Sequence, residues 1–290
     1  MRPQLFEYYA PSSLNEVLDL LHSNEEAKVL AGGQSLTSLM KLRVASPQAL
    51  VDINGLEELS YIREESGMIG IGTLVRHDQL ARDNLIRKHM PLLSDAAGVI
   101  ADQQVRNRGT MGGSLAHADP AADLPTAFTA VNATVITASV NGSRSIEMGD
   151  FFRDYFTTSL GHDEIIKQVR VMIPTSKYGN AYQKLSKGHN DFAIVAVAVQ
   201  LIVDKDQVCN SASVVLGGVA PTPVHARETE KLLNGSRLDN DVIERSAQKA
   251  SEGLKPPSDI RASAEYRLKM ARRLTQRTIT HSVQRIQGGA

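Results

Sequence analysis

Two glycine-rich segments carry residue types that bind phosphate. In the first, residues 27–41, an apolar run reads as a strand, Gly32 and Gly33 turn the chain, and Gln34 and Ser35 begin an apolar-periodic helix. Glycine lets a ligand approach the backbone, and the unpaired N–H groups at a helix start carry partial positive charge. A tight turn that requires positive φ would explain one Gly-Gly pair equally well, so this segment alone leaves both readings open.

The second segment, residues 106–115 (RNRGTMGGSL), repeats the pattern with Gly109, Gly112 and Gly113. It leads into an acidic segment, residues 119–125 (DPAADLP), that begins another helix. Two such segments closing on one ligand would hold its two phosphates from opposite sides, so a dinucleotide is the natural candidate. Neither is the G-x-G-x-x-G of a Rossmann turn, and no P-loop motif is present. NAD in a doubly wound sheet and nucleoside triphosphate hydrolysis therefore lose support.

Composition and cysteine usage exclude other classes. The 290 residues include 32 basic and 32 acidic ones, so no charge excess argues for nucleic acid or an anionic membrane. Cys209 is the single cysteine, and we expect a buried structural thiol; an iron–sulfur cluster needs several thiolates, so this chain cannot hold one by itself. The sequence begins without a signal-peptide pattern, and its longest apolar run, residues 192–203, is too short for a bilayer. We expect a cytoplasmic protein without a membrane span.

The spacing of apolar residues predicts an α+β chain in three parts. Residues 1–55 read as a small α/β unit that presents the first glycine segment, and residues 56–175 as a larger α+β unit that contains the second. Residues 176–290 read as an antiparallel meander followed by helices. The expected strands of the meander are residues 181–186, 192–204 and 211–220, and the expected helices are residues 227–233, 241–254 and 263–283.

Residues 31–36 (AGGQSL), 104–113 (QVRNRGTMGG) and 119–125 resemble the FAD-binding medium subunit of the molybdenum hydroxylases, a group that includes xanthine, carbon monoxide and nicotine dehydrogenases. The resemblance runs from Phe6 to about Ala271. It implies a two-part FAD-binding domain of the PCMH (vanillyl-alcohol oxidase-like) type, followed by a CO dehydrogenase flavoprotein C-terminal domain with a three-stranded antiparallel sheet and helices. It also implies non-covalent FAD, with the molybdenum cofactor and [2Fe–2S] clusters only on a large and a small partner subunit, in a dimer of heterotrimers.

The resemblance further implies which residues contact FAD. Backbone N–H groups of residues 32–35 and 111–114, with the hydroxyls of Ser35, Thr110 and Ser114, would bind the pyrophosphate. Many relatives have histidine where Gln34 stands, and either side chain can form a hydrogen bond. The implied contacts are Ala31, Gly32, Gly33, Gln34, Ser35, Leu36, Ile100, Thr110, Met111, Gly112, Gly113, Ser114, Asp123, Ile166, Lys184, Lys187 and Phe192. No catalytic residue and no metal ligand is implied.

Some of these residues have simpler readings. Asp123 could cap the helix that begins at Leu124, and residue type alone favours that role over a contact with a sugar or ribityl hydroxyl, although the two can coexist. From sequence alone Ile100 and Ile166 are core residues. Arg106 and Arg108 are explained as surface cations, or as guanidinium groups that order loops or meet phosphate.

The segment 182–192 offers two lysines and an aromatic residue. From sequence alone it is a strand, a polar turn and the start of another strand. The resemblance brings it near the isoalloxazine ring, where a cation at the N1/C2-carbonyl edge would raise the flavin potential and Phe192 would cover a ring face. We expect Lys184, rather than Lys187, to be that cation. His117 has no obvious nucleophile partner, and we expect either a loop histidine or one that supports the residues that contact the ligand.

Three functions remain. The first is an FAD-binding electron-transfer subunit of an oxidoreductase, which passes electrons from [2Fe–2S] clusters of a partner through FAD to an external acceptor, while the substrate is hydroxylated on another subunit. The second is a free-standing flavin oxidase or dehydrogenase, for which the C-terminal half offers no conspicuous acid–base set. The third is a scaffold that has lost the cofactor, and the intact Gly32-Gly33 and Gly112-Gly113 pairs argue against it. We expect the first; neither the substrate nor the acceptor follows from the sequence.

Overall fold

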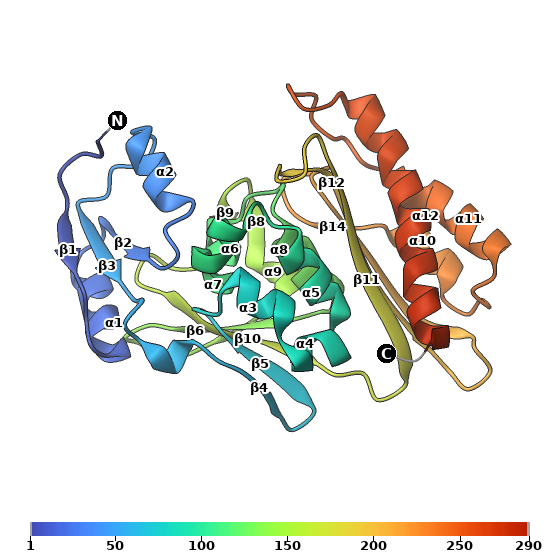
Figure 1. Cartoon of the computed structure of the whole chain (residues 1–290), viewed down its shortest axis with the longest axis horizontal. Helices are drawn as coiled ribbons and strands as arrows, with labels where there is room; N and C mark the ends of the chain where they lie inside the picture. The colour runs from blue at the N-terminus through green and yellow to red at the C-terminus, as the bar shows by residue number, and fades with distance from the viewer. Residues whose placement is uncertain (1, 289–290) are drawn as a thin grey trace.

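The computed structural model describes residues 2–288. Figure 1 shows three units in a row: a small N-terminal α/β unit, a central five-stranded sheet with helices over it, and a four-stranded sheet that carries the last helices on its outer face. Within residues 2–288, none of the helices has the length and apolar character that a membrane crossing requires.

The N-terminal unit alternates strands and helices. Its elements are β1 (Glu7–Tyr9), α1 (Leu14–Ser23), β2 (Ala27–Leu30), α2 (Leu36–Lys41) and β3 (Ala49–Asp52). The strands are parallel in the order β1-β3-β2. Ser13 caps α1 by accepting a hydrogen bond from the Glu16 N–H, and Val17, Leu18 and Leu21 bury one face of that helix. The turn from β2 to α2 is the first glycine segment, so this unit holds it at the C-terminal end of a parallel strand.

The central unit is an antiparallel sheet covered by short helices. Its strands β4 (Ile62–Glu65), β5 (Met68–Gly72), β6 (Thr134–Ala138), β7 (Ser145–Glu147) and β10 (Ile165–Met172) pair in the order β4-β5-β10-β6-β7. The helical elements are η1 (Glu57–Leu59), α3 (His77–Arg82), α4 (Asn84–His89), α5 (Pro91–Gly98), α6 (Gln103–Arg108), α7 (Met111–His117), α8 (Asp123–Ala130) and α9 (Met148–Phe151), with a hairpin of β8 (Phe152–Asp154) and β9 (Thr157–Thr158). Ile69, Ile71 and Val169 of the sheet share a core with Leu93 and Phe128 of the helices.

The C-terminal unit has four antiparallel strands and three α-helices. They are β11 (Lys177–Ser186), β12 (Ala193–Val203), β13 (Cys209–Gly217), β14 (Val224–His225), α10 (Arg227–Leu233), α11 (Asn240–Gln248), η2 (Lys249–Ser251) and α12 (Ala264–Gly288). Side chains alternate along β12, so Ala196 and Ala198 join the central core against α8, whereas Val195, Val197 and Val199 join the core under α12. One strand therefore belongs to two cores.

The structure confirms the predicted α+β architecture and the antiparallel meander, with one strand more than expected. The additional strand β14 is two residues long and pairs with β13. The helix expected over residues 241–254 ends at Gln248 and continues only as the η2 turn. Cys209 is buried as expected, and burial raises the pKa of its thiol to about 11.

Candidate cofactor site

A cavity of about 550 Å³ is lined by residues of all three units. Its wall includes the end of α1, strand β2, both glycine segments, the loop between β9 and β10, and the turn between β11 and β12. All of the residues predicted to contact FAD line this cavity except Met111 and Lys187. Met111 is buried in the central core, and Lys187 is exposed in the turn after β11. The fold thus brings the two glycine segments, whose glycines lie 76 residues or more apart in sequence, to one cavity.

The first glycine segment holds the free donors. Gly33 adopts a φ of +71°, which only glycine takes without strain, and Ser35 stands at the N-cap of α2 without capping it. None of the N–H groups of residues 32–36 forms a hydrogen bond with any residue that the structure describes. A row of unpaired N–H groups in a cavity wall is suited to an anion.

The second glycine segment differs from the prediction. Gly112 and Gly113 do not form a turn before a helix; they lie in the first turn of α7, which Thr110 caps. The backbone N–H groups of this turn are paired within the protein: Met111 with the carbonyl of Val75, Gly112 with that of Thr73, Ser114 with that of Thr110, and Gly113 with the Thr110 hydroxyl. The expectation that residues 111–114 offer backbone donors to a pyrophosphate is wrong, because the fold already uses those donors.

Close packing, rather than free backbone, explains several of the glycines. A Cβ atom on Gly32 would collide with the carbonyl oxygen of Arg108 and would come within 2.7 Å of the Cα of Gly109. A Cβ atom on Gly112 would collide with the side chain of Thr73. The two segments therefore touch at Gly32 and Gly109, and any larger residue there would push them apart.

Arg76 ties the N-terminal unit to the second segment. Its guanidinium donates to the carbonyl of Arg108 and, at 2.7 Å, to Oδ1 of Asn54. The amide of Asn54 in turn donates to the carbonyl of Ala31 at 2.8 Å. This chain of hydrogen bonds links the two glycine segments.

Three arginines leave positive charge beside these segments. Arg76, Arg106 and Arg108 form no ion pair with a carboxylate anywhere in residues 2–288. Arg106 donates instead to the carbonyls of residues 100 and 101, at 2.8 Å each. Among the described residues, the nearby Asp52 carboxylate acts on the charge of Arg76, and Arg108 helps to lower the pKa of Asp52, in both cases without an ion-pair contact. An anionic ligand would balance this charge.

A buried ion pair forms another part of the wall. Lys184 Nζ lies 3.1 Å from Asp123 Oδ2, with each side chain 6% exposed, and the Tyr182 hydroxyl donates to Asp123 Oδ1 at 2.6 Å. Burial raises the pKa of Asp123, while Lys184 and Tyr182 act against that rise. Asp123 is the first residue of α8 and its side chain makes no cap, so the N-cap reading is wrong. Lys184 is the lysine at the cavity, as expected, but it is paired rather than free.

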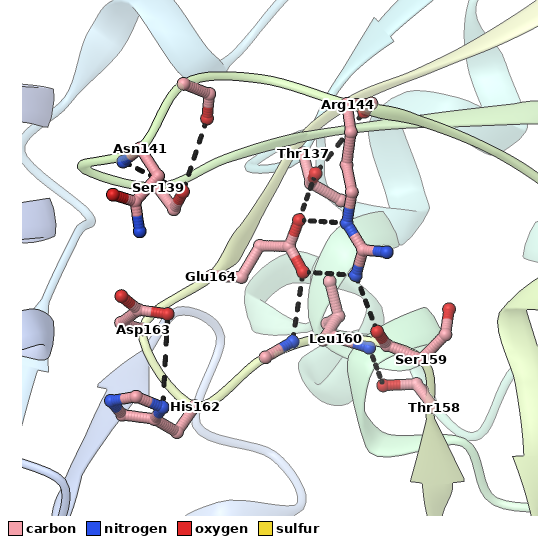
Figure 2. A network of polar contacts seen from close by, with 12 residues as sticks. Thr137, Ser139, Asn141, Arg144, Thr158, Ser159, Leu160, His162, Asp163 and Glu164 are labelled. Carbon is pink, nitrogen blue, oxygen red and sulfur yellow. Dashed lines mark hydrogen bonds and ion pairs between the residues drawn. The ribbon is translucent and has the colours of Figure 1, made fainter.

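Figure 2 shows how Arg144 and Glu164 brace the loop between β9 and β10. Arg144 donates to both carboxylate oxygens of Glu164, at 2.8 and 2.7 Å, and to the carbonyl of Ser159 at 2.7 Å. Burial would raise the pKa of Glu164, but hydrogen bonds led by that from Arg144 outweigh it and lower the pKa to about 2. Asp163 pairs with His22 at the end of α1, at 2.9 Å. The loop is thereby held against the N-terminal unit on the side of the cavity.

Arg267 joins the last helix to the cavity wall. It is 3% exposed, forms two hydrogen bonds with Asp259 at 2.8 and 2.9 Å, and donates to the carbonyls of Ile194 and Gly218. The main chain at the ends of β12 and β13 in turn donates to the carbonyls of residues 120 and 121, which precede Asp123. Residues of the C-terminal unit thus hold the loop that precedes Asp123 and leads into α8.

The remaining predicted residues lie at the cavity in different ways. Ile166 is 4% exposed and belongs to the central core as well as to the wall, and Ile100 is half-buried there. Phe192 is 46% exposed, with the Arg261 guanidinium 5.3 Å from its ring centre. The loop alternative for His117 is wrong, because His117 is the last residue of α7; it lines the cavity and packs against Phe156.

Sequence reasoning missed several lining residues. They include Lys28, Thr73, His77, Leu160, His162, Glu164, Asn190 and Asp191. His77 stands out because it is 5% exposed and neither ring nitrogen forms a hydrogen bond with a described residue. No motif spacing relates His77 to the glycine segments; the pairing of residues 75–77 with residues 109–111 brings them together.

Two family models and several known proteins match this chain. Residues 4–176 match the family model of the FAD binding domain in molybdopterin dehydrogenase, and residues 180–282 match that of the CO dehydrogenase flavoprotein C-terminal domain. The chain is 38% identical to the glyceraldehyde dehydrogenase medium chain of Sulfolobus acidocaldarius, over 96% of this chain and 98% of that one. It is 34% identical to the nicotine 6-hydroxylase medium subunit of Paenarthrobacter nicotinovorans, over 97% and 99%.

A solved structure agrees with the sequence comparisons. The carbon monoxide dehydrogenase from Hydrogenophaga pseudoflava that lacks the Mo-pyranopterin moiety of its cofactor contains a chain with a TM-score of 0.94 and 36% identity, which covers 98% of this chain and 99% of that one. The fold, the cavity with its two glycine segments and these matches lead to one conclusion: the chain belongs to the family of FAD-binding medium subunits of the molybdenum hydroxylases.

Proposed function

We propose that this chain is the FAD-binding electron-transfer subunit of a molybdenum- and iron–sulfur-containing dehydrogenase. The observation that carries the proposal is the row of N–H groups of residues 32–36, which pair with no described residue, in a cavity lined by both glycine segments. Arg76, Arg106 and Arg108 lie next to these segments, outside the cavity lining, and form no ion pair within residues 2–288. A pyrophosphate supplies acceptors for these N–H groups and negative charge next to these arginines. Bound non-covalently, FAD supplies the chemistry, since a flavin can accept electrons one at a time and pass them on.

The chain's own residues would bind and orient the cofactor. The N–H groups of residues 32–36 would hold phosphate, and Ile100 and Ile166 would exclude water from apolar parts of FAD. The Asp123 carboxylate could accept a hydrogen bond from a sugar or ribityl hydroxyl. Because Lys184 is paired with Asp123, its effect on the flavin would be that of a dipole, weaker than that of a lone ammonium group.

We also propose an assembly. The matched relatives include a medium chain and a medium subunit, which supports a large molybdenum-cofactor partner and a small [2Fe–2S] partner for this chain. The finer statements of the proposal are a heterotrimer present twice, a cytoplasmic location, and a division of the chain at residues 55 and 175. Three hydrophobic cores support the division. The core of the N-terminal unit also contains residues from beyond position 55, and the central core contains residues from beyond position 175.

The visible absorption spectrum of the purified chain tests the proposal first. We expect a flavin spectrum, release of FAD on acid precipitation, and neither iron nor molybdenum in the chain alone. Co-expression with the proposed large and small partner subunits should yield one complex whose flavin is reduced through the partners. A colourless chain that takes up no added FAD would refute the proposal.

The same preparation distinguishes a free-standing flavin oxidase. Such an enzyme would have its flavin reduced directly by an organic substrate without any partner chain. An electron-transfer subunit alone should show no flavin reduction by aldehydes, purines or nicotine-like heterocycles, and should gain it only in the complex.

A further inference from the structure

The imidazole of His77 lacks a hydrogen-bond partner. His77 is the first residue of α3, and its side chain lines the cavity although only 5% of it is exposed. Its Nδ1 atom is fully enclosed without a partner, and no side-chain hydrogen bond joins either ring nitrogen to another residue within residues 2–288. Nδ1 is enclosed by the chain itself, so Nε2, which is not fully enclosed, is the nitrogen that can meet a ligand in the cavity. Buried polar groups are normally paired, and an imidazole in a cavity wall whose Nε2 has no described partner points to a partner that is not part of the chain.

The position of the ring identifies which part of a ligand it would meet. The His77 N–H donates to the carbonyl of Gly109 at 3.0 Å. A Cβ atom on Gly109 would lie 2.6 Å from Cδ2 and 2.8 Å from Nε2 of the imidazole, so glycine is required there to make room for the ring. Because Gly32 also packs closely against Gly109, His77 lies next to the contact between the two glycine segments.

The surroundings of the ring favour an anion. Arg76 precedes His77 in the chain and Arg106 lies close enough to act on it, and neither arginine pairs with a carboxylate of residues 2–288. Burial, followed by Arg106 and Arg76, lowers the pKa of His77 to about 4. At neutral pH the ring is therefore uncharged, with one N–H donor and one acceptor nitrogen. The arginines supply charge, and the histidine supplies one directed hydrogen bond.

We infer that His77 is a cofactor-binding residue whose imidazole donates a hydrogen bond to a phosphate oxygen of FAD held between the two glycine segments. The inference rests on the proposed function, since it takes FAD as the ligand. The inference adds to the second glycine segment a phosphate-binding residue that lies outside both segments. It also explains Gly109, whose lack of a side chain serves the histidine rather than the phosphate.

The test compares full-length chains that carry His77→Phe, His77→Gln or the control His89→Gln. His89 ends α4 and does not line the cavity. We would measure the Kd for FAD by flavin fluorescence after removal of the cofactor, and record ³¹P NMR spectra of bound FAD. Loss of one hydrogen bond to a charged group predicts an approximately 10- to 100-fold weaker Kd for His77→Phe. The ³¹P resonances should move, the visible flavin spectrum should not, and His77→Gln, which keeps a donor, should recover part of the affinity.

Each outcome supports or refutes the role of His77. If wild-type protein fails to take up FAD, the proposed function and the inference fall together. If wild-type protein binds FAD and His77→Phe binds equally tightly, or more weakly with unmoved ³¹P resonances, the inference alone falls. If His77→Phe is unfolded by circular dichroism, the folded His77→Gln variant decides by its ³¹P shifts. His89→Gln should match wild type in every measurement.

Discussion

The buried ion pair predicts how much the substitution Lys184→Met costs. This substitution leaves the Asp123 carboxylate enclosed, with the Tyr182 hydroxyl as its one side-chain partner within residues 2–288, and such a carboxylate takes up a proton rather than stay charged. The ordinary pKa of aspartate is 3.8. Protonation therefore costs about 4.4 kcal/mol at pH 7 and about 1.6 kcal/mol at pH 5, at 1.36 kcal/mol per pH unit. We expect a loss of about 3 to 4 kcal/mol in the free energy of unfolding at pH 7, and of about 1 to 2 kcal/mol at pH 5.

The assay is urea unfolding of the FAD-free chain, followed by circular dichroism at both pH values. Asp123→Asn and the double variant complete a thermodynamic cycle. Because the double variant buries no charge, it should be about 2 kcal/mol or more stable than the sum of the single losses predicts. Lys187→Met is the matched control, since Lys187 is exposed and away from the cavity, and its loss should stay below about 0.5 kcal/mol. Equal losses at pH 7 and pH 5, or an additive double variant, would refute the reasoning.

Two further predictions concern the glycine segment and pH. Gly33→Ala should lower FAD affinity at least about tenfold, whereas Gly67→Ala, a similar positive-φ glycine in a hairpin turn with open space around it, should cost about 1 kcal/mol of stability and leave FAD binding unchanged. The free energy of unfolding should fall by about 3 kcal/mol as pH falls from 6.5 to 4, because unfolded His77 binds a proton that folded His77 binds only near pH 4. Urea unfolding measured across this pH range should show that decrease in the wild-type chain and not in His77→Gln. If the slope is unchanged in that variant, His77 is not held neutral.

The sequence predicted elements better than it predicted contacts. The first glycine segment is local, since a strand, Gly33 at positive φ and a short helix follow one another in the chain. The second segment was misread because glycine inside a helix is disfavoured by propensity, and Gly112 is required there only by its contact with Thr73, 39 residues earlier. That contact leaves no periodic signal.

Tertiary pairing also explains the other differences. Asp123 has the residue type of a cap, but its partners Tyr182 and Lys184 lie on a strand about 60 residues later, so the sequence favoured the local role. The strand β14 was missed because two residues among prolines carry no alternating pattern. His77 lies near Gly109 only because short stretches of backbone pair across the cavity wall.

The double role of β12 bears on how such subunits can be recombined. The two matched regions meet between residues 176 and 180, which suggests an obvious point for making chimeras between relatives. Yet Tyr182, Ala196 and Ala198 lie beyond that point and complete the core of the central unit, and both partners of Asp123 lie beyond it too. A chimera cut there exchanges part of the interior that supports the cofactor cavity. Successful exchange would have to carry the facing residues of α8 along with the C-terminal strands.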